Sequence, residues 1–109
     1  MARRVKRLYK DACQLCGVQI IGIDGRTYSE GAHVRPLGRP HLGPDVDTNI
    51  LCLCPNHHTQ LDVGGILIQD DMSVAGTDGS ALGSLTFVGA HQLLPANVEY
   101  HRELWKSRR

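Results

Sequence analysis

The chain has 109 residues, of which 41% are hydrophobic and only 5% aromatic, so it is long enough for one domain whose core is short of large side chains. The formal net charge is +1, and no run of about 18 apolar residues occurs, which excludes a membrane-spanning helix. The N-terminus is basic but lacks the apolar stretch of a secretory signal, so we expect a cytoplasmic protein.

The basic residues gather at the two ends of the sequence. The first ten residues carry five basic groups and no acid, and the last nine carry four basic groups and one acid. Between them the acids outnumber the bases. Two basic arms suit a polyanion such as a nucleic-acid backbone, although solvated and frayed termini give the same pattern.

The first third of the chain predicts a helix followed by extended segments. Apolar residues recur at helical spacing over 2–12. Residues 18–23 and 26–28 are predicted strands, and they flank Asp24-Gly25, a dipeptide typical of a two-residue hairpin turn. A second extended stretch is expected over 32–35.

The remainder predicts a loop, two helices and several short strands. Residues 36–47 hold three prolines and two glycines, which indicates a loop. Pro55 is suited to the first turn of a helix over 55–62, and a final helix is expected over 95–106. The predicted strands are 50–53, 66–69, 72–74 and 85–88.

Four residues have the spacing of a zinc site. Cys13 and Cys16 form one x-x pair, and Cys54 and His57 form a second, so that three thiolates and an imidazole can surround one tetrahedral Zn²⁺. Cys52 is the alternative fourth ligand, but it lies in an apolar run and is interpreted as a core thiol. Disulfides and a redox Cys-x-x-Cys are the competing interpretations, and paired x-x spacing in an intracellular chain favours the metal.

A structural zinc ion would supply the stability that the thin core lacks. We therefore predict an α+β domain over 1–109, with a basic helix at 2–12, a zinc-stapled core at 13–65 and C-terminal strands and a helix at 66–106.

Three further polar residues, His33, Asn49 and His58, complete a recognisable order. The segments that carry it are Glu30-Gly-Ala-His33-Val-Arg-Pro-Leu, Gly43-Pro-Asp-Val-Asp-Thr-Asn49 and Leu51-Cys-Leu-Cys54-Pro-Asn-His57-His58. This order resembles the HNH (ββα-metal) nuclease motif. It is particularly similar to the HNH domains that follow an SRA (YDG) modified-base reader in modification-dependent, type IV restriction enzymes.

The resemblance implies a role for each of these residues. His33 matches the general base that deprotonates the attacking water, Asn49 matches the residue that braces the loop, and His58 matches a ligand of the catalytic Mg²⁺ or Mn²⁺. The expected reaction is metal-dependent hydrolysis of DNA phosphodiester bonds. Taken singly, each residue also has a structural interpretation, as a satisfied histidine, a turn-forming asparagine or an exposed helix residue.

One position departs from the family pattern. Many HNH nucleases have Asp immediately before the first His, where this chain has Ala32. Asp62, one helical turn after His58, is the first candidate for the missing oxygen ligand, and Asp45 and Glu30 are weaker ones. The departure also motivates a rival interpretation, a catalytically inactive, zinc-stapled DNA-binding module.

The expected partner is double-stranded DNA, with or without modified bases. One site cuts one strand, so a double-strand break requires a homodimer, and recognition of a modified base would need a reader domain that these residues lack. The candidate phosphate contacts are Arg3, Arg4, Lys6, Arg7, Arg35 and Arg39.

Overall fold

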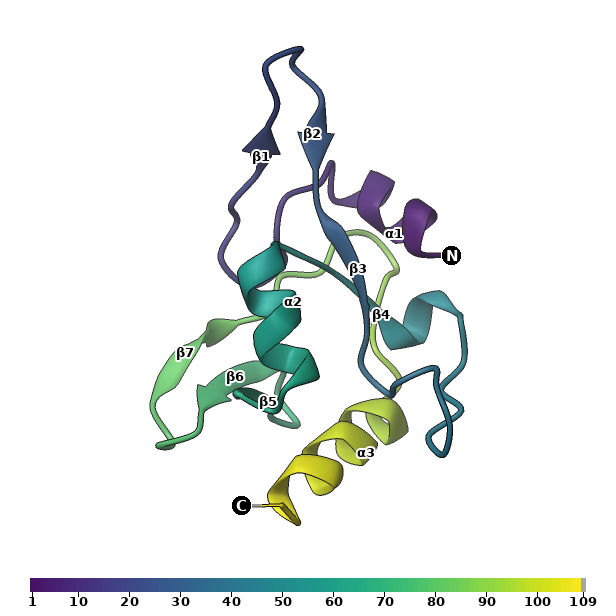
Figure 1. Ribbon diagram of the computed structural model, residues 1–109, viewed down its shortest axis with the longest axis vertical. Helices are drawn as coiled ribbons and strands as arrows, with labels where there is room; N and C mark the ends of the chain where they lie inside the picture. The colour runs from purple at the N-terminus through teal and green to yellow at the C-terminus, as the bar shows by residue number, and fades with distance from the viewer. Residues whose placement is uncertain (109) are drawn as a thin grey trace.

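The computed structural model describes residues 1–108, and it confirms the α+β class (Figure 1). The elements in chain order are α1 (Ala2–Leu8), β1 (Ile20–Ile21), β2 (Thr27–Tyr28), β3 (Glu30–His33), a 3-10 turn η1 (Asp47–Asn49), β4 (Ile50–Leu53), α2 (Pro55–Asp62), β5 (Ile66–Ile68), β6 (Ser73–Gly76), β7 (Ala81–Ser84) and α3 (Pro95–Lys106). Among these residues no helix is both long and apolar enough to cross a membrane.

The antiparallel pair β3–β4 lies at the centre of the fold and is followed directly by α2 (Figure 1). Its register runs from Glu30 opposite Leu53 to His33 opposite Ile50. All four residues of β4 are buried, because side chains on both of its faces are covered. One face contributes to the main core, whose members include Ala32, Leu51, Leu53, Leu61, Ile66, Ile68 and Val98.

The opposite face of β3–β4 packs against α1. Val5 and Tyr9 from the N-terminal segment form a second apolar cluster with Ile50 and Cys52. The helix comes so close that a Cβ atom at Gly31 would lie 2.6 Å from the Cβ of Ala2. The absence of a side chain at Gly31 therefore lets α1 lie directly on β3.

The first helix ends earlier than predicted, at Leu8 instead of residue 12. Lys10 and Asp11 adopt positive φ angles of 51° and 62°, which no α-helix accommodates. The Asp11 carboxylate accepts hydrogen bonds from the hydroxyl groups of Thr27 (2.6 Å) and Ser29. These contacts join the turn to the hairpin, so tertiary bonds replace the last helical turn.

The predicted hairpin around Asp24-Gly25 is confirmed, but its strands are shorter than expected and five residues, 22–26, connect them instead of two. Ile20 pairs with Tyr28 and Ile21 with Thr27, and the hairpin projects from the body of the molecule (Figure 1).

The predicted strand over 85–88 is wrong. The third strand of the β5–β6–β7 sheet is Ala81–Ser84, whose residues are all exposed and include only one large apolar side chain, Leu82. After Leu85 the chain leaves the sheet, and the backbone N–H of Thr86 donates to the carbonyl of Gln14. Leu85 and Phe87 contribute to the main core from this irregular segment.

Candidate active site and metal centre

The structure brings together the four predicted zinc ligands. Cys13 and Cys16 lie in the turn after α1, Cys54 lies between β4 and α2 as the N-cap residue of that helix, and His57 lies in the first turn of α2. Their ligand atoms all lie within 4.8 Å of one another. The Cys16 and Cys54 sulfurs are 3.9 Å apart, far too long for a disulfide but close to the edge of about 3.8 Å expected for a tetrahedron with Zn–S bonds of about 2.3 Å.

The protein environment prepares one of these thiols for a cation. Burial raises the pKa of Cys13, but backbone N–H groups of Cys16, Cys54 and Leu15 outweigh it and lower the pKa to about 6. This environment favours the thiolate of Cys13, the form that binds a metal ion, whereas burial raises the pKa of Cys16 to about 11. The residues present fit Zn²⁺ in number, type and spacing.

Cys52 lies outside this cluster, as expected for a core thiol. It is fully buried, and its thiol donates to the carbonyl of Ala12 at 3.4 Å. Burial raises the pKa of Cys52, which keeps it protonated.

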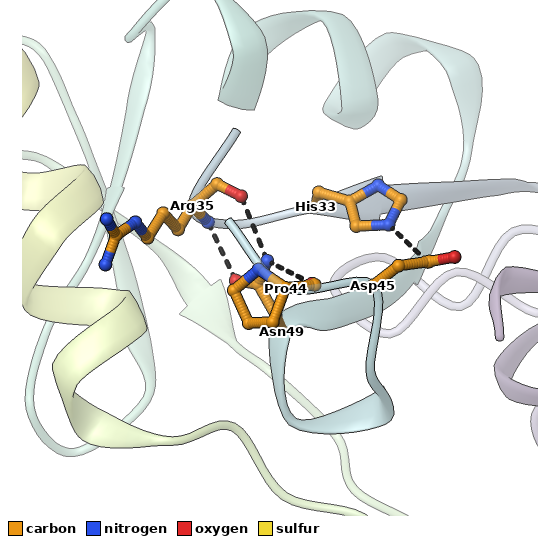
Figure 2. A network of polar contacts seen from close by, with 5 residues as sticks. All are labelled: His33, Arg35, Pro44, Asp45 and Asn49. Atoms are coloured by element: carbon orange, nitrogen blue, oxygen red, sulfur yellow. Dashed lines mark hydrogen bonds and ion pairs between the residues drawn. The ribbon is translucent and has the colours of Figure 1, made fainter. Parts of the chain in front are cut away.

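Asn49 braces the loop that follows β3. Its side chain is fully buried, its Oδ1 accepts from the backbone N–H of Arg35 (2.8 Å), and its Nδ2 donates to the carbonyls of Arg35 (2.9 Å) and Pro44 (3.0 Å) (Figure 2). One side chain thus joins the two ends of the loop. Because Arg35 follows β3 closely, these bonds also fix the end of the strand that carries His33.

His33 is oriented by a carboxylate from the same loop. Its Nε2 lies 2.9 Å from Oδ1 of Asp45, and this hydrogen bond lowers the pKa of Asp45 (Figure 2). A carboxylate is only an acceptor, so Nε2–H donates to it and a neutral ring keeps its lone pair on Nδ1. Asp45, which the sequence suggested as a weaker candidate metal ligand, forms a hydrogen bond with His33 instead.

His58 lies between two carboxylates. Its Nδ1 is 2.8 Å from Oε1 of Glu30, and its Nε2 is 3.1 Å from Oδ2 of Asp62. Glu30 is itself held by the hydroxyl group of Tyr28, which donates to Oε2 at 2.6 Å. The bonds from Tyr28 and then His58 lower the pKa of Glu30, so it remains ionised.

His33 and His58 open into one cleft of about 260 Å³, which Pro36, Leu37 and Asp62 also line. They reach it from different elements, His33 from the end of β3 and His58 from α2. The fully buried Ala32 packs in the main core and takes no part in the cleft. The oxygen groups nearest His58 are therefore those of Asp62 and Glu30.

Arg35 is not brought to this cleft. Its Nε donates to the carbonyl of His41 at 2.7 Å, and its guanidinium carbon lies 4.4 Å from the ring centroid of Tyr100. Figure 2 shows its side chain extending away from His33. Arg39 is exposed in the loop, next to Pro40.

The contribution of Tyr28 was not predicted from the sequence. An available signal was its i, i+2 relation to Glu30, which places both side chains on the same side of one extended segment. His91 was also missed: it is buried, its Nδ1 accepts from the Tyr9 hydroxyl (2.6 Å), and its Nε2 donates to the carbonyl of Asp47 (2.8 Å). No local pattern marks His91, because its partners lie far away in the sequence.

The family model described as HNH endonuclease matches residues 13–69, which include the four thiol and imidazole ligands and the whole cleft. The chain belongs to the HNH endonuclease family. Its predicted resemblance to this family is therefore confirmed, and the β3–β4–α2 unit is the HNH core.

A solved structure extends the similarity of this HNH chain beyond the matched core. The protein titled "Modification dependent TagI restriction endonuclease" is 43% identical, with a TM-score of 0.89 over 94% of this chain. The match covers 36% of that protein, so the HNH chain spans about a third of its length. Among curated proteins no match was found.

Proposed function

We propose that this HNH chain is a divalent-metal-dependent DNA endonuclease that hydrolyses phosphodiester bonds with a histidine-activated water. We further propose that it serves as the cleavage domain of a modification-dependent restriction enzyme. The observation that carries the proposal is the shared cleft: both His33 and His58 line it, and each ring contacts a carboxylate.

His33 acts as the general base. With Nε2–H held by Asp45, the lone pair of Nδ1 is available to accept a proton from water, and the carboxylate stabilises the imidazolium that forms. Asn49 acts indirectly, since it fixes the loop that carries Asp45 and the strand end that carries His33. The base that deprotonates the attacking water is thus oriented before the substrate binds.

His58 and Asp62 would hold the catalytic divalent ion. If Glu30 holds the proton on Nδ1, then Nε2 and the Asp62 oxygen are two acceptors 3.1 Å apart, which favours a cation between them. Two cis ligands at about 2.1 Å in an octahedral Mg²⁺ or Mn²⁺ site lie about 3 Å apart. When bound, such an ion would polarise the phosphodiester and stabilise charge on the leaving oxygen.

Incubation of supercoiled plasmid with the zinc-loaded protein and Mg²⁺ or Mn²⁺ tests the proposal. We expect nicking by the wild type, loss of nicking in His33→Ala and His58→Ala, and retention in Thr59→Ala, which changes an exposed position beside His58. Nicking that persists in His33→Ala contradicts the assignment of the base. DNA binding without nicking under either ion supports the rival, an inactive DNA-binding module.

Comparing methylated with unmethylated substrate DNA provides a second test of the proposal. The cleft at the candidate site is lined by the residues proposed for hydrolysis, and we propose that a separate reader domain recognises any modified base. We therefore expect the isolated chain to nick methylated and unmethylated plasmid equally. One site cuts one strand, so linear product is expected only where two copies act on opposite strands.

A further inference from the structure

A second cleft, of about 370 Å³, lies between α1 and β2 and is strongly basic. Four cationic side chains line it, and the aromatic ring of Tyr28 forms part of its wall. The cations are Arg3, Lys6, Arg7 and Lys10. Arg4, the remaining basic residue of α1, lines a neighbouring cleft with Asp47 and His91, and Arg7 lines both clefts.

The protein's own carboxylates offset only part of the charge of this cleft. Asp11 is the one acid in its lining, and both of its oxygens are occupied by the hydroxyl groups of Thr27 and Ser29. Among residues 1–108, no carboxylate forms an ion pair with the four cations. Clustered, unpaired cations repel one another, and an anionic ligand relieves that repulsion.

The basic cleft is connected to the candidate active site through the β2–β3 segment. Tyr28 lines the basic cleft and donates to Glu30, which in turn contacts His58 in the catalytic cleft. Lys6 is near enough to Glu30 to contribute to its lowered pKa. From Tyr28 to His33 the extended chain covers about 16 Å, at about 3.3 Å per residue.

We propose that this cleft binds the phosphodiester backbone of the DNA substrate on one side of the scissile bond. The inference rests on the proposed function, because it takes the strand cut beside His33 to be the strand held by α1. Phosphates of one strand repeat about every 3.4 Å along the duplex axis, so a backbone following the β2–β3 edge places the bound phosphates within about five nucleotides of the cut. Lysine and arginine contacts of this kind give affinity without sequence preference.

The salt dependence of DNA binding tests this site without requiring catalysis. The double variant Arg3→Gln/Lys10→Gln removes two exposed cations of the cleft, and the control Lys106→Gln/Arg108→Gln removes the same charge near the end of α3. Figure 1 shows that α3 ends far from α1. Affinity for a short duplex is measured by fluorescence anisotropy over a range of salt, in a His33→Ala background that prevents cleavage.

We expect the slope of log K against log salt to become shallower by about 1.8 in the cleft variant, since each lost phosphate contact contributes about 0.9. At 0.1 M salt this corresponds to roughly 60-fold weaker binding. The control should keep the slope of its parent. An unchanged slope in the cleft variant, an equal change in the control, or no measurable duplex binding overturns the inference.

Plasmid nicking measured in parallel separates this inference from the proposed function. Nicking by the wild type together with an unchanged slope in the cleft variant rejects the cleft and leaves the nuclease proposal standing. The expected slopes together with no nicking by the wild type support the cleft and reject the catalytic assignment. In an active enzyme, Arg3→Gln/Lys10→Gln should raise KM and leave kcat unchanged, because it weakens binding remote from the reacting atoms.

Discussion

Replacing Cys54 and Cys52 in turn by alanine provides a sharp test of the zinc centre. The two cysteines are separated by one residue, both are buried, and each substitution removes one sulfur atom. Only Cys54 has its sulfur in the cluster, 3.3 Å from Nδ1 of His57 and 3.9 Å from the sulfur of Cys16. The pair therefore separates loss of a metal ligand from loss of core volume.

The expected magnitudes differ widely. A structural zinc site contributes on the order of 10–16 kcal/mol of binding free energy, which is comparable with the whole stability of a small domain at about 5–15 kcal/mol. Cys54→Ala should therefore leave the chain largely unfolded at 25 °C. Cys52→Ala removes one buried atom and one weak hydrogen bond, so it should cost about 1 kcal/mol.

The assay combines metal analysis of the purified protein with urea unfolding followed by circular dichroism. We expect about one zinc ion per chain in the wild type and in Cys52→Ala, and none in Cys54→Ala. A Cys54→Ala protein that keeps its zinc, or whose stability equals that of Cys52→Ala, would refute the reasoning. Zinc loss in Cys52→Ala alone would identify Cys52 as the ligand.

Three further predictions follow from side chains that the fold brings into contact. Asn49→Ala should cost about 3 kcal/mol of unfolding free energy in urea, since three buried backbone groups lose their partner; a loss below about 1 kcal/mol contradicts the brace. Glu30→Ala should weaken Mn²⁺ binding, measured by electron paramagnetic resonance, about 10–100-fold, because His58 loses the carboxylate that orients it. Glu30→Gln should recover part of the affinity, and equal affinity in the wild type and both variants excludes a positioning role. Gly64→Ala should destabilise the protein by about 2–4 kcal/mol and Gly79→Ala by about 1 kcal/mol. Both glycines have a positive φ, but only a Cβ at Gly64 would lie 2.4 Å from the ring of Trp105 in α3. Equal decreases in melting temperature would show that the Trp105 ring moves aside without cost.

The chemistry of this protein was predictable wherever its residues are close in sequence. The Cys-x-x-Cys and Cys-Pro-Asn-His pairs are local chelates, so their spacing alone sets which atoms can share an ion. The hairpin at Asp24-Gly25 and the start of α2 at Pro55 depend on backbone preferences of single residues, and both lie where they were expected. The choice of Cys54 over Cys52 followed from the apolar run around Cys52.

Strand boundaries were less predictable, because pairing partners outweigh intrinsic preference. Ala81–Ser84 forms a strand although all its residues are exposed and none is β-branched or aromatic, since the turn at Asp78-Gly79 returns the chain onto β6. The more apolar residues 85–88 leave the sheet, where Leu85 and Phe87 join the core. A period-2 pattern cannot distinguish these outcomes.

By itself the sequence determined the residue types of the site, the four members of the Cys-His cluster and the family. Only the tertiary structure decided how the carboxylates are shared: Asp45 contacts His33, whereas Glu30 and Asp62 contact His58. The physical reason is that two of these contacts join residues 12 and 28 positions apart, and several acids were equally placed to make them. Which one does so depends on the β3–β4 register and on the path of the braced loop, and both are set by packing across the whole domain.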